Sequence, residues 1–388
     1  MKMKNLIKAI ICLLIITACS DDDDNQPKII AGGPTGLDNG DTDVIIEDPF
    51  IYSPTQYLKE AVNFPMGNIV SAQRVTNTQP VNETRRAFIG DEYNSLTAEN
   101  DMKMANMYSG PGEYEWSDGD AIVEYAKANG LRVHGHALVW HSSIPGWLLN
   151  FSGTDAEFET LVKDYVQAAV THFAEEKDVD GNSVVASWDV VNEGFETTAN
   201  NANFFRTRLG SDYIAKCFTW AREADADVKL FYNDFNVTGQ PSKRQTILNM
   251  VSNFQSNNTP IDGIGMQMHL NYNFPTDDLP LAIEQIAATG LLVHISELDV
   301  KANPQDDLTE FTEERAIAQE EQYQRAGYYY TDLVPEAQQW GITIWGFTDD
   351  ESWLYEGGSD WPLLYDNDFN FKIAHRGLIA GLNGESPD

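Results

Sequence analysis

The sequence predicts a closed (β/α)8 barrel, in a single domain that follows a signal peptide and a flexible tether. Two patterns indicate this fold. From Phe64 onward, short runs rich in β-branched and aromatic residues alternate with longer segments of helical period, as in repeated βα units. Polar and aromatic side chains also gather where one predicted strand after another ends. Because the carboxyl ends of parallel strands meet on one face of a barrel, these side chains would share a single site.

Eight predicted strands alternate with helices, which favours a closed barrel over an open sheet. In chain order the strands comprise residues 65–70, 95–99, 131–138, 184–192, 229–233, 263–269, 291–297 and 341–347. Helical segments such as residues 155–173 and 310–334 would form the outer ring. We expect residues 53–388 to form one domain, since about 330 residues of balanced composition can bury a single large core.

The side chains at the predicted strand ends carry amide, carboxylate, imidazole and indole groups. They are Glu99 and Asn100, His136 and Trp140, Asn192 and Glu193, Asn233 and Asp234, Gln267 and His269, Glu297 and Asp299, and Trp345 and Asp349. Chance does not readily place such groups at seven strand ends. The pattern therefore predicts a functional cleft at the carboxyl face of the barrel.

The charge of the chain excludes one class of ligand. It contains 25 basic and 60 acidic residues, for a formal net charge of −35. Nucleic acid is therefore not an expected partner, because its phosphates would be repelled. The acidic surface is better explained as solvation of the protein than as attraction to a substrate.

Residues 1–18 have the features of a bacterial lipoprotein signal peptide. A basic head is followed by a short apolar stretch, residues 9–16, which cannot span a bilayer. The sequence Ile16-Thr17-Ala18-Cys19 resembles a lipobox, which directs cleavage before the cysteine and its acylation. The alternative is an ordinary signal peptide with a chance cysteine. If Cys19 is acylated, Cys217 has no partner for a disulfide in the mature chain.

Residues 19–52 are predicted to be a tether. The segment begins with the acidic run Asp21 to Asp24 and has too few large apolar groups to fold. An acidic run directly after a lipidated cysteine resembles a signal for export to the outer face of some Gram-negative bacteria, although a solvated charge run explains it equally well. We expect a monomer that is lipid-anchored to the outer membrane and exposed on the cell surface.

Two glutamates end predicted strands in similar ways. Glu193 closes the apolar run Trp188 to Asn192, and Glu297 follows Ile295-Ser296. Cleavage of a glycosidic bond needs such a pair, one carboxyl to protonate the leaving oxygen and one to attack or to activate water. A lone acid near a strand end is more often a member of a structural ion pair. The pairing of two, with aromatic residues around them, favours catalysis.

The motifs of the chain resemble those of glycoside hydrolase family 10 over about residues 64–381. They are Leu96 to Lys103, Gly135 to His141, Trp188 to Glu193, Tyr232 to Asn236, Gly263 to His269, Ser296 to Val300, Trp345 to Asp349, and Ser352-Trp353. The ordered set is far more specific than any one match. Two positions depart from the family pattern, since Met104 replaces a frequent aromatic residue and Leu354 a common basic residue.

The resemblance implies a retaining endo-β-1,4-xylanase that cuts xylan or xylooligosaccharides and needs no cofactor or metal. It assigns Glu193 as the acid/base and Glu297 as the nucleophile of a covalent glycosyl-enzyme. Asn192 would form a hydrogen bond to the sugar 2-hydroxyl, and this hydrogen bond would strengthen in the transition state. His269 would line the substrate site and, with Asp299, orient Glu297.

Further residues match positions that bind the substrate in the family. Glu99, Asn100, Lys103, His136 and Gln267 would form hydrogen bonds to sugars, and Trp140, Trp345 and Trp353 would pack against pyranose rings. Of Trp140 and His141, one would line the cleft and the other support it. We expect Asn233 and Asp234 to be structural.

Two other functions remain to be weighed. The spacing of His134 and His136 is typical of metal ligands in some barrel hydrolases, but no obvious further ligands accompany the pair. A surface glycan-binding lipoprotein could keep the barrel without its chemistry. The presence of both glutamates argues against this alternative.

Overall fold

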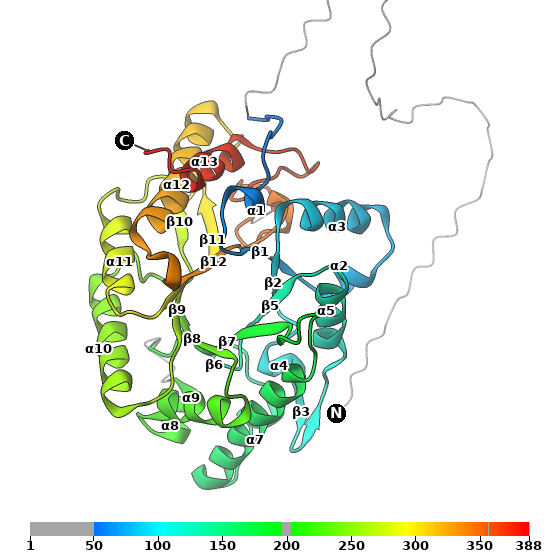
Figure 1. The fold of residues 1–388 in the computed structure, drawn as a ribbon, viewed down its shortest axis with the longest axis vertical. Coiled ribbons are helices and arrows are strands. Elements are labelled where there is room, and N and C mark those ends of the chain that lie inside the picture. The colour runs from blue at the N-terminus through cyan, green and yellow to red at the C-terminus, as the bar shows by residue number, and fades with distance from the viewer. Residues whose placement is uncertain (1–49, 196–202, 356, 388) are drawn as a thin grey trace, which may run out of the picture. The chain divides into compact units, whose positions relative to one another are not determined.

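The computed structural model describes residues 50–195, 203–355 and 357–387 (Figure 1). The predicted signal peptide, Cys19 and most of the predicted tether lie outside the described residues. Within these limits, no helix has the length and apolar character needed to cross a membrane.

A closed barrel of eight parallel strands forms the centre of the described chain, which confirms the predicted fold. The strands are β1 (Met66–Val70), β2 (Ser95–Ala98), β5 (Arg132–Gly135), β7 (Val185–Asn192), β8 (Lys229–Asp234), β9 (Gly263–Met266), β11 (Leu292–Lys301) and β12 (Gln339–Ile344). Each pairs with the next in this order, and β12 pairs with β1 to close the barrel. A separate antiparallel ribbon joins β3 (Tyr108–Gly110) to β4 (Glu113–Tyr114).

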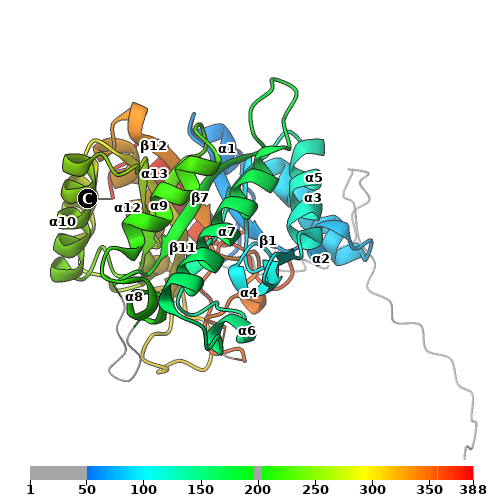
Figure 2. The same cartoon turned by 90° about the horizontal axis from the view of Figure 1, so that it is seen from below.

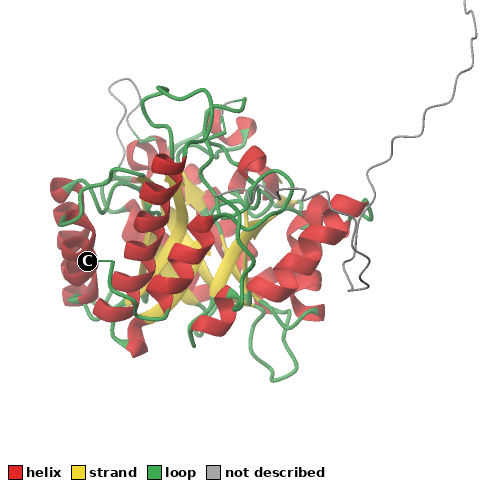
Figure 3. Cartoon of the chain, turned by 90° about the horizontal axis from the view of Figure 1, so that it is seen from above, coloured by secondary structure: helices red, strands yellow, loops and turns green. Residues whose placement is uncertain are grey.

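Helices surround the barrel (Figure 3). They are α1 (Leu58–Ala61), α2 (Ala72–Thr76), α3 (Pro80–Glu92), α4 (Met104–Met107), α5 (Ser117–Ala128), α6 (Gly146–Leu149), α7 (Asp155–Ala174), α8 (Phe204–Leu209), α9 (Tyr213–Ala224), α10 (Pro241–Asn257), α11 (Asp278–Ala287), α12 (Glu313–Leu333) and α13 (Ile373–Leu382). Short 3-10 turns occupy Glu336–Gln338 and Asp349–Glu351.

Helix α7 shows how the sequence sets an element of the outer ring. Thr154 and Glu157 form a capping box that satisfies free backbone N–H groups at its start. Its buried residues recur every three or four positions from Phe158 to Phe173, so one apolar face packs inward. Helices α7 and α9 lie side by side outside β7 (Figure 2).

Strand β7 divides its side chains between the barrel interior and the helix layer. Trp188 points outward, where its ring lies 5.7 Å from that of Phe173. Gly135 pairs with Trp188 on the neighbouring strand, and a Cβ there would lie 2.3 Å from the indole. The close packing of β5 against this indole therefore requires glycine.

Two predicted strands are interrupted in the structure. The third ends at Gly135 rather than at residue 138, the peptide between His136 and Ala137 is cis, and pairing with β7 resumes in β6 (Val139–Trp140). The sixth ends at Met266, and pairing with β11 resumes in β10 (His269–Asn271). Each interruption falls where a side chain enters the cleft described below.

The predicted end of the tether also differs from the structure. Ile51 pairs with Lys372, and the N–H of Tyr52 donates to the carbonyl of Phe371. The Tyr52 hydroxyl in turn contacts His375. Residues 50–52, which the sequence places in the tether, thus pair with the C-terminal part of the domain.

Candidate active site

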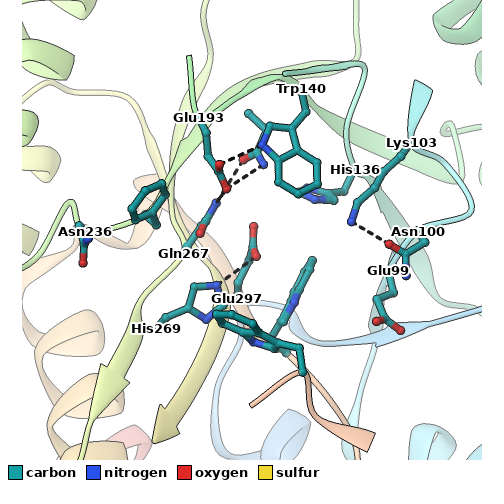
Figure 4. A pocket seen from close by; sticks show the side chains of 14 residues that line it. Glu99, Asn100, Lys103, His136, Trp140, Glu193, Asn236, Gln267, His269 and Glu297 are labelled. Atoms are coloured by element: carbon teal, nitrogen blue, oxygen red, sulfur yellow. Dashed lines mark hydrogen bonds and ion pairs between the residues drawn. The ribbon is translucent and has the colours of Figure 1, made fainter. Parts of the chain in front are cut away.

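Glu193 lies directly after β7 with both carboxylate oxygens held by donors. Oε2 accepts a hydrogen bond from Trp140 Nε1 at 2.9 Å, and Oε1 accepts one from Gln267 Nε2 at 3.0 Å (Figure 4). The Asn192 amide lies 3.4 Å from Oε1. The residue itself has φ +53°, in the left-handed region that side chains other than glycine rarely adopt. Donors from three strand ends thus converge on one carboxylate.

Glu297 lies within β11 and is 5% exposed. Its Oε1 accepts a hydrogen bond from Asn233 Nδ2 at 2.7 Å, and its Oε2 lies 3.3 Å from His269 Nε2. The other ring nitrogen of His269 lies 2.9 Å from Asp299 Oδ2. Trp353 Nε1 donates to the same Asp299 oxygen at 3.0 Å. A chain of polar contacts therefore runs from the cleft wall to Glu297.

His269 supplies a positive charge between two carboxylates. Burial lowers its pKa, but the charges and contacts of Asp299 and Glu297 outweigh burial and raise it to about 10. The ring is therefore an imidazolium at neutral pH. Its charge compensates the carboxylate of Glu297 in a position that water hardly reaches.

One cavity of about 460 Å³ brings the predicted catalytic and substrate-binding residues together. Its lining comprises Glu99, Asn100, Lys103, His136, Trp140, Asn192, Glu193, Gln267, His269, Glu297, Trp345 and Trp353, together with Phe235 and Asn236. Asp299 does not line the cavity and lies behind His269. Trp140 lines the cavity and His141 packs against its ring. Of these two residues, Trp140 is therefore the one in the cleft and His141 is the one that supports it.

Charged side chains contact one another in the part of the cavity formed by β2 and the segment after it. Lys103 Nζ donates to Asn100 Oδ1 at 2.9 Å and lies 4.9 Å from the centre of the Trp140 ring (Figure 4). Burial lowers the pKa of Lys103. Glu99 lies 3.5 Å from Arg74, which also contacts Glu351. These side chains present both donors and acceptors to a polar ligand.

Asn233 has a larger role than the sequence indicated. We predicted it to be structural, but its amide donates directly to Glu297 and also to Asn192 Oδ1 at 3.0 Å. The Ser296 hydroxyl donates to the side-chain oxygen of Asn233 at 2.6 Å. This hydrogen bond fixes the orientation of the Asn233 amide. The signal available in the sequence was its place at a strand end. Phe235 and Asn236 also line the cavity, although the sequence alone did not assign them to it. They are the two residues that follow the end of β8.

The His134 and His136 pair serves the barrel interior. Both rings contact Asp189 Oδ2, at 3.1 and 2.9 Å, and His134 also contacts Ser187. Burial raises the pKa of Asp189, but the two histidines outweigh burial and hold that pKa below its ordinary value. The contact with Asp189 leaves His136 Nε2 for the cavity. The spacing that suggested a metal site is thus explained by a shared carboxylate.

Met104 and Leu354 depart from the family pattern without lining the cavity. Met104 is fully buried and Leu354 is 7% exposed. Their side chains form part of the support around the cleft, so an effect on a ligand would pass through other residues.

A parallel barrel whose strand ends direct two carboxylates into one cavity with tryptophan walls defines the glycoside hydrolase class. Residues 55–380 match the family model described as glycosyl hydrolase family 10. The chain belongs to this family.

Known relatives agree with this assignment. The endo-β-1,4-xylanase Xyn10C of Cellvibrio japonicus is 36% identical over 348 residues, which cover 83% of this chain and 56% of Xyn10C. The chain thus spans about half the length of that relative. A β-1,4-xylanase of Dictyoglomus thermophilum is 35% identical over 73% of this chain and 80% of its own. The structure of a mutant of the Cellvibrio japonicus xylanase 10C with xylopentaose has a TM-score of 0.78 and 34% identity, and covers 87% of this chain and 71% of that chain.

The charge of His269 predicts an alkaline loss of stability. Its pKa is about 10 in the folded chain and about 6.5 when unfolded, so the folded state binds the proton more tightly. The stabilisation is complete below about pH 6.5 and should fall by up to ~1.4 kcal/mol per pH unit until about pH 10. We expect the difference in unfolding free energy between wild type and His269→Gln to shrink over this range. Denaturant titrations at several pH values measure it, and a constant difference would contradict the assigned charge.

Proposed function

We propose that the chain is an endo-β-1,4-xylanase that hydrolyses internal bonds of xylan with retention of configuration. The observation that carries this proposal is the pair of carboxylates, Glu193 and Glu297, in one cavity with separate sets of donors. The substrate class is supported by relatives that are named xylanases and by the xylopentaose bound to one of them. We further propose that the chain acts as a monomer.

The two glutamates differ in their surroundings, which supports different roles. Glu297 is almost fully buried and lies 3.3 Å from His269 Nε2, a position that suits attack on the anomeric carbon. Glu193 receives neutral donors and would protonate the leaving oxygen as the glycosidic bond breaks. It would then take a proton from the water that hydrolyses the glycosyl ester. Asn192 lies beside Glu193 and would bind the sugar 2-hydroxyl.

The remaining lining residues suit the binding of a neutral sugar chain. Asn100, Lys103 and His136 offer donors, and Glu99 offers acceptors. Trp353 is 61% exposed, and its indole N–H is anchored to Asp299, so its position is fixed while its face stays open. Such a face can pack against a pyranose ring.

The proposed roles predict distinct effects of Glu193→Ala and Glu297→Ala. Each should reduce xylan cleavage by roughly 10³-fold or more while the fold is kept. Glu193→Ala should still release activated aryl leaving groups, which need no proton, and azide should restore its turnover. Glu297→Ala should form no glycosyl-enzyme with either kind of substrate.

Steady-state kinetics on xylooligosaccharides and on 2,4-dinitrophenyl xylobioside measure the two effects, with circular dichroism as the check on folding. Equal behaviour of the two variants in both assays would refute the assignment of roles.

We expect xylan to be preferred over cellulose. Glucose carries a hydroxymethyl group at C5 that must find room beside Trp345 and Trp353. A loss of ~2 to 3 kcal/mol of transition-state binding would discriminate by roughly thirty- to two-hundredfold. Xylo- and cellooligosaccharides of equal length give the comparison without the effect of crystallinity. Equal kcat/KM on both series would overturn the specificity, and Trp353→Ala should narrow the preference if the wall acts sterically.

We also propose that the mature protein begins at Cys19 and is anchored by lipid to the outer membrane, on the cell surface. The lipobox-like sequence and the acidic run after it support this location. Metabolic labelling with a fatty acid should mark the wild type, and Cys19→Ala should remove the label. A wild-type protein without label that begins at another residue would rule out the anchor.

A further inference from the structure

Side-chain contacts outside the strand pairing support the backbone that follows Glu193. Glu193 has a left-handed φ and its N–H donates to the carbonyl of Asn233 at 2.9 Å, which is its last link to β8. Left-handed backbone is unfavourable for a residue with a Cβ, so the surrounding structure must maintain it. The next peptide group, at Gly194, is where that support is found.

Buried side chains hold Gly194 through both its N–H and its carbonyl. Its N–H donates to the Tyr232 hydroxyl at 3.0 Å. Its carbonyl accepts from the Tyr213 hydroxyl at 3.0 Å and from Arg206 Nη2 at 3.2 Å. The close approach requires glycine, because a Cβ at residue 194 would lie 3.0 Å from the Tyr213 hydroxyl and 2.9 Å from Ile214.

The Tyr232 hydroxyl is itself fixed by charge. It donates to Asp234 Oδ2 at 2.6 Å, and Lys243 Nζ lies 2.6 Å from Asp234 Oδ1. Tyr232 and Asp234 are fully buried, and neither lines the cavity. Burial raises the pKa of Tyr232, so the hydroxyl keeps its proton. With its proton directed to Asp234, the hydroxyl oxygen is left to accept from Gly194.

We propose that Tyr232, fixed by Asp234 and Lys243, and Tyr213 are positioning residues that hold Glu193 in place for proton transfer. The proposal takes the acid/base role of Glu193 from the proposed function. Neither tyrosine touches the cavity, so they act through the Gly194 peptide alone. Glu297 lies within β11 instead of after its end, so the clamp formed by the two tyrosines does not contact the peptide that follows Glu297.

This difference gives the clamp a kinetic signature. A displaced Glu193 should slow the step that protonates the leaving oxygen, while attack by Glu297 stays intact. Proton transfer requires hydrogen-bond reach, and a shift of about 1 Å can cost roughly a hundredfold in rate. Substrates with poor leaving groups should therefore suffer, and substrates with activated leaving groups should not.

Tyr232→Phe tests this by removing only the hydroxyl. We expect kcat/KM, which reports glycosylation, to fall roughly ten- to a hundredfold on xylotetraose and to change less than about threefold on 2,4-dinitrophenyl xylobioside. Tyr213→Phe should show the same pattern more weakly, since Arg206 still holds the carbonyl. If Tyr232→Phe does not fold, Tyr213→Phe carries the test.

Tyr330→Phe is the matched control. Its buried hydroxyl also accepts from a backbone N–H, that of Gly341 at 2.9 Å, and donates to an oxygen, the carbonyl of Val293 at 2.7 Å. These contacts lie at the amino ends of β11 and β12, far from the cleft. We expect Tyr330→Phe to lower stability without any dependence on the leaving group.

The outcomes separate the clamp from the role of Glu193. An equal fall on both substrates for the tyrosine variants, or no fall on either, would overturn the clamp. Glu193→Ala is measured alongside them. If its loss is also independent of the leaving group, the acid/base assignment itself has failed.

Discussion

Parallel pairing of β7, β8, β9 and β11 is the constraint on which the site depends. The register places Asn192 beside Asn233, and Asn233 beside Gly265. The Asn233 amide can therefore contact both Asn192 and, across Gly265, Glu297 of β11. A Cβ at residue 265 would lie 2.2 Å from the side-chain oxygen of Asn233, so this position requires glycine. A slip of one residue in any of these pairs would turn the amide away from Glu297. The hydrogen bonds of the site are thus consequences of the sheet register.

Charge compensation is the second requirement, and the barrel meets it in layers. Below the cleft, the buried carboxylate of Asp189 contacts both His134 and His136, and these contacts hold its pKa below the ordinary value. At the cleft, His269 lies between Glu297 and Asp299. Buried charges are tolerated only when they are paired and hydrogen-bonded. The three acidic side chains that line the cavity, Glu99, Glu193 and Glu297, each contact a donor.

The fold and most of the cavity lining could be predicted from the sequence, because strand periodicity located all eight strands and the residues at their ends gave most of the lining. Lys103 and Trp353 were assigned only through the resemblance to the family. The misjudged feature was Asn233, whose role depends on register and on the orientation that Ser296 gives its amide. Phe235 and Asn236 were missed for a related reason, since they follow the strand end and reach the cavity only through the path of the loop. The interruptions after Gly135 and Met266 were also not predicted, since the local sequence pattern continues through both.

The two glutamates are held by different means, and this difference follows from where the chain leaves the sheet. Glu297 lies within β11 and is followed by four more residues of that strand, and its N–H donates to the carbonyl of Gln267. Glu193 directly follows the last residue of β7, so the backbone after it needs contacts other than strand pairing. The structure supplies that support from α8, α9 and the end of β8, through Arg206, Tyr213 and Tyr232. In the proposed roles, the acid/base is thus supported by side chains that contact the peptide after it, whereas the nucleophile lies inside a strand. If these roles are correct, substitutions in α8 and α9 would alter proton transfer without disturbing nucleophilic attack.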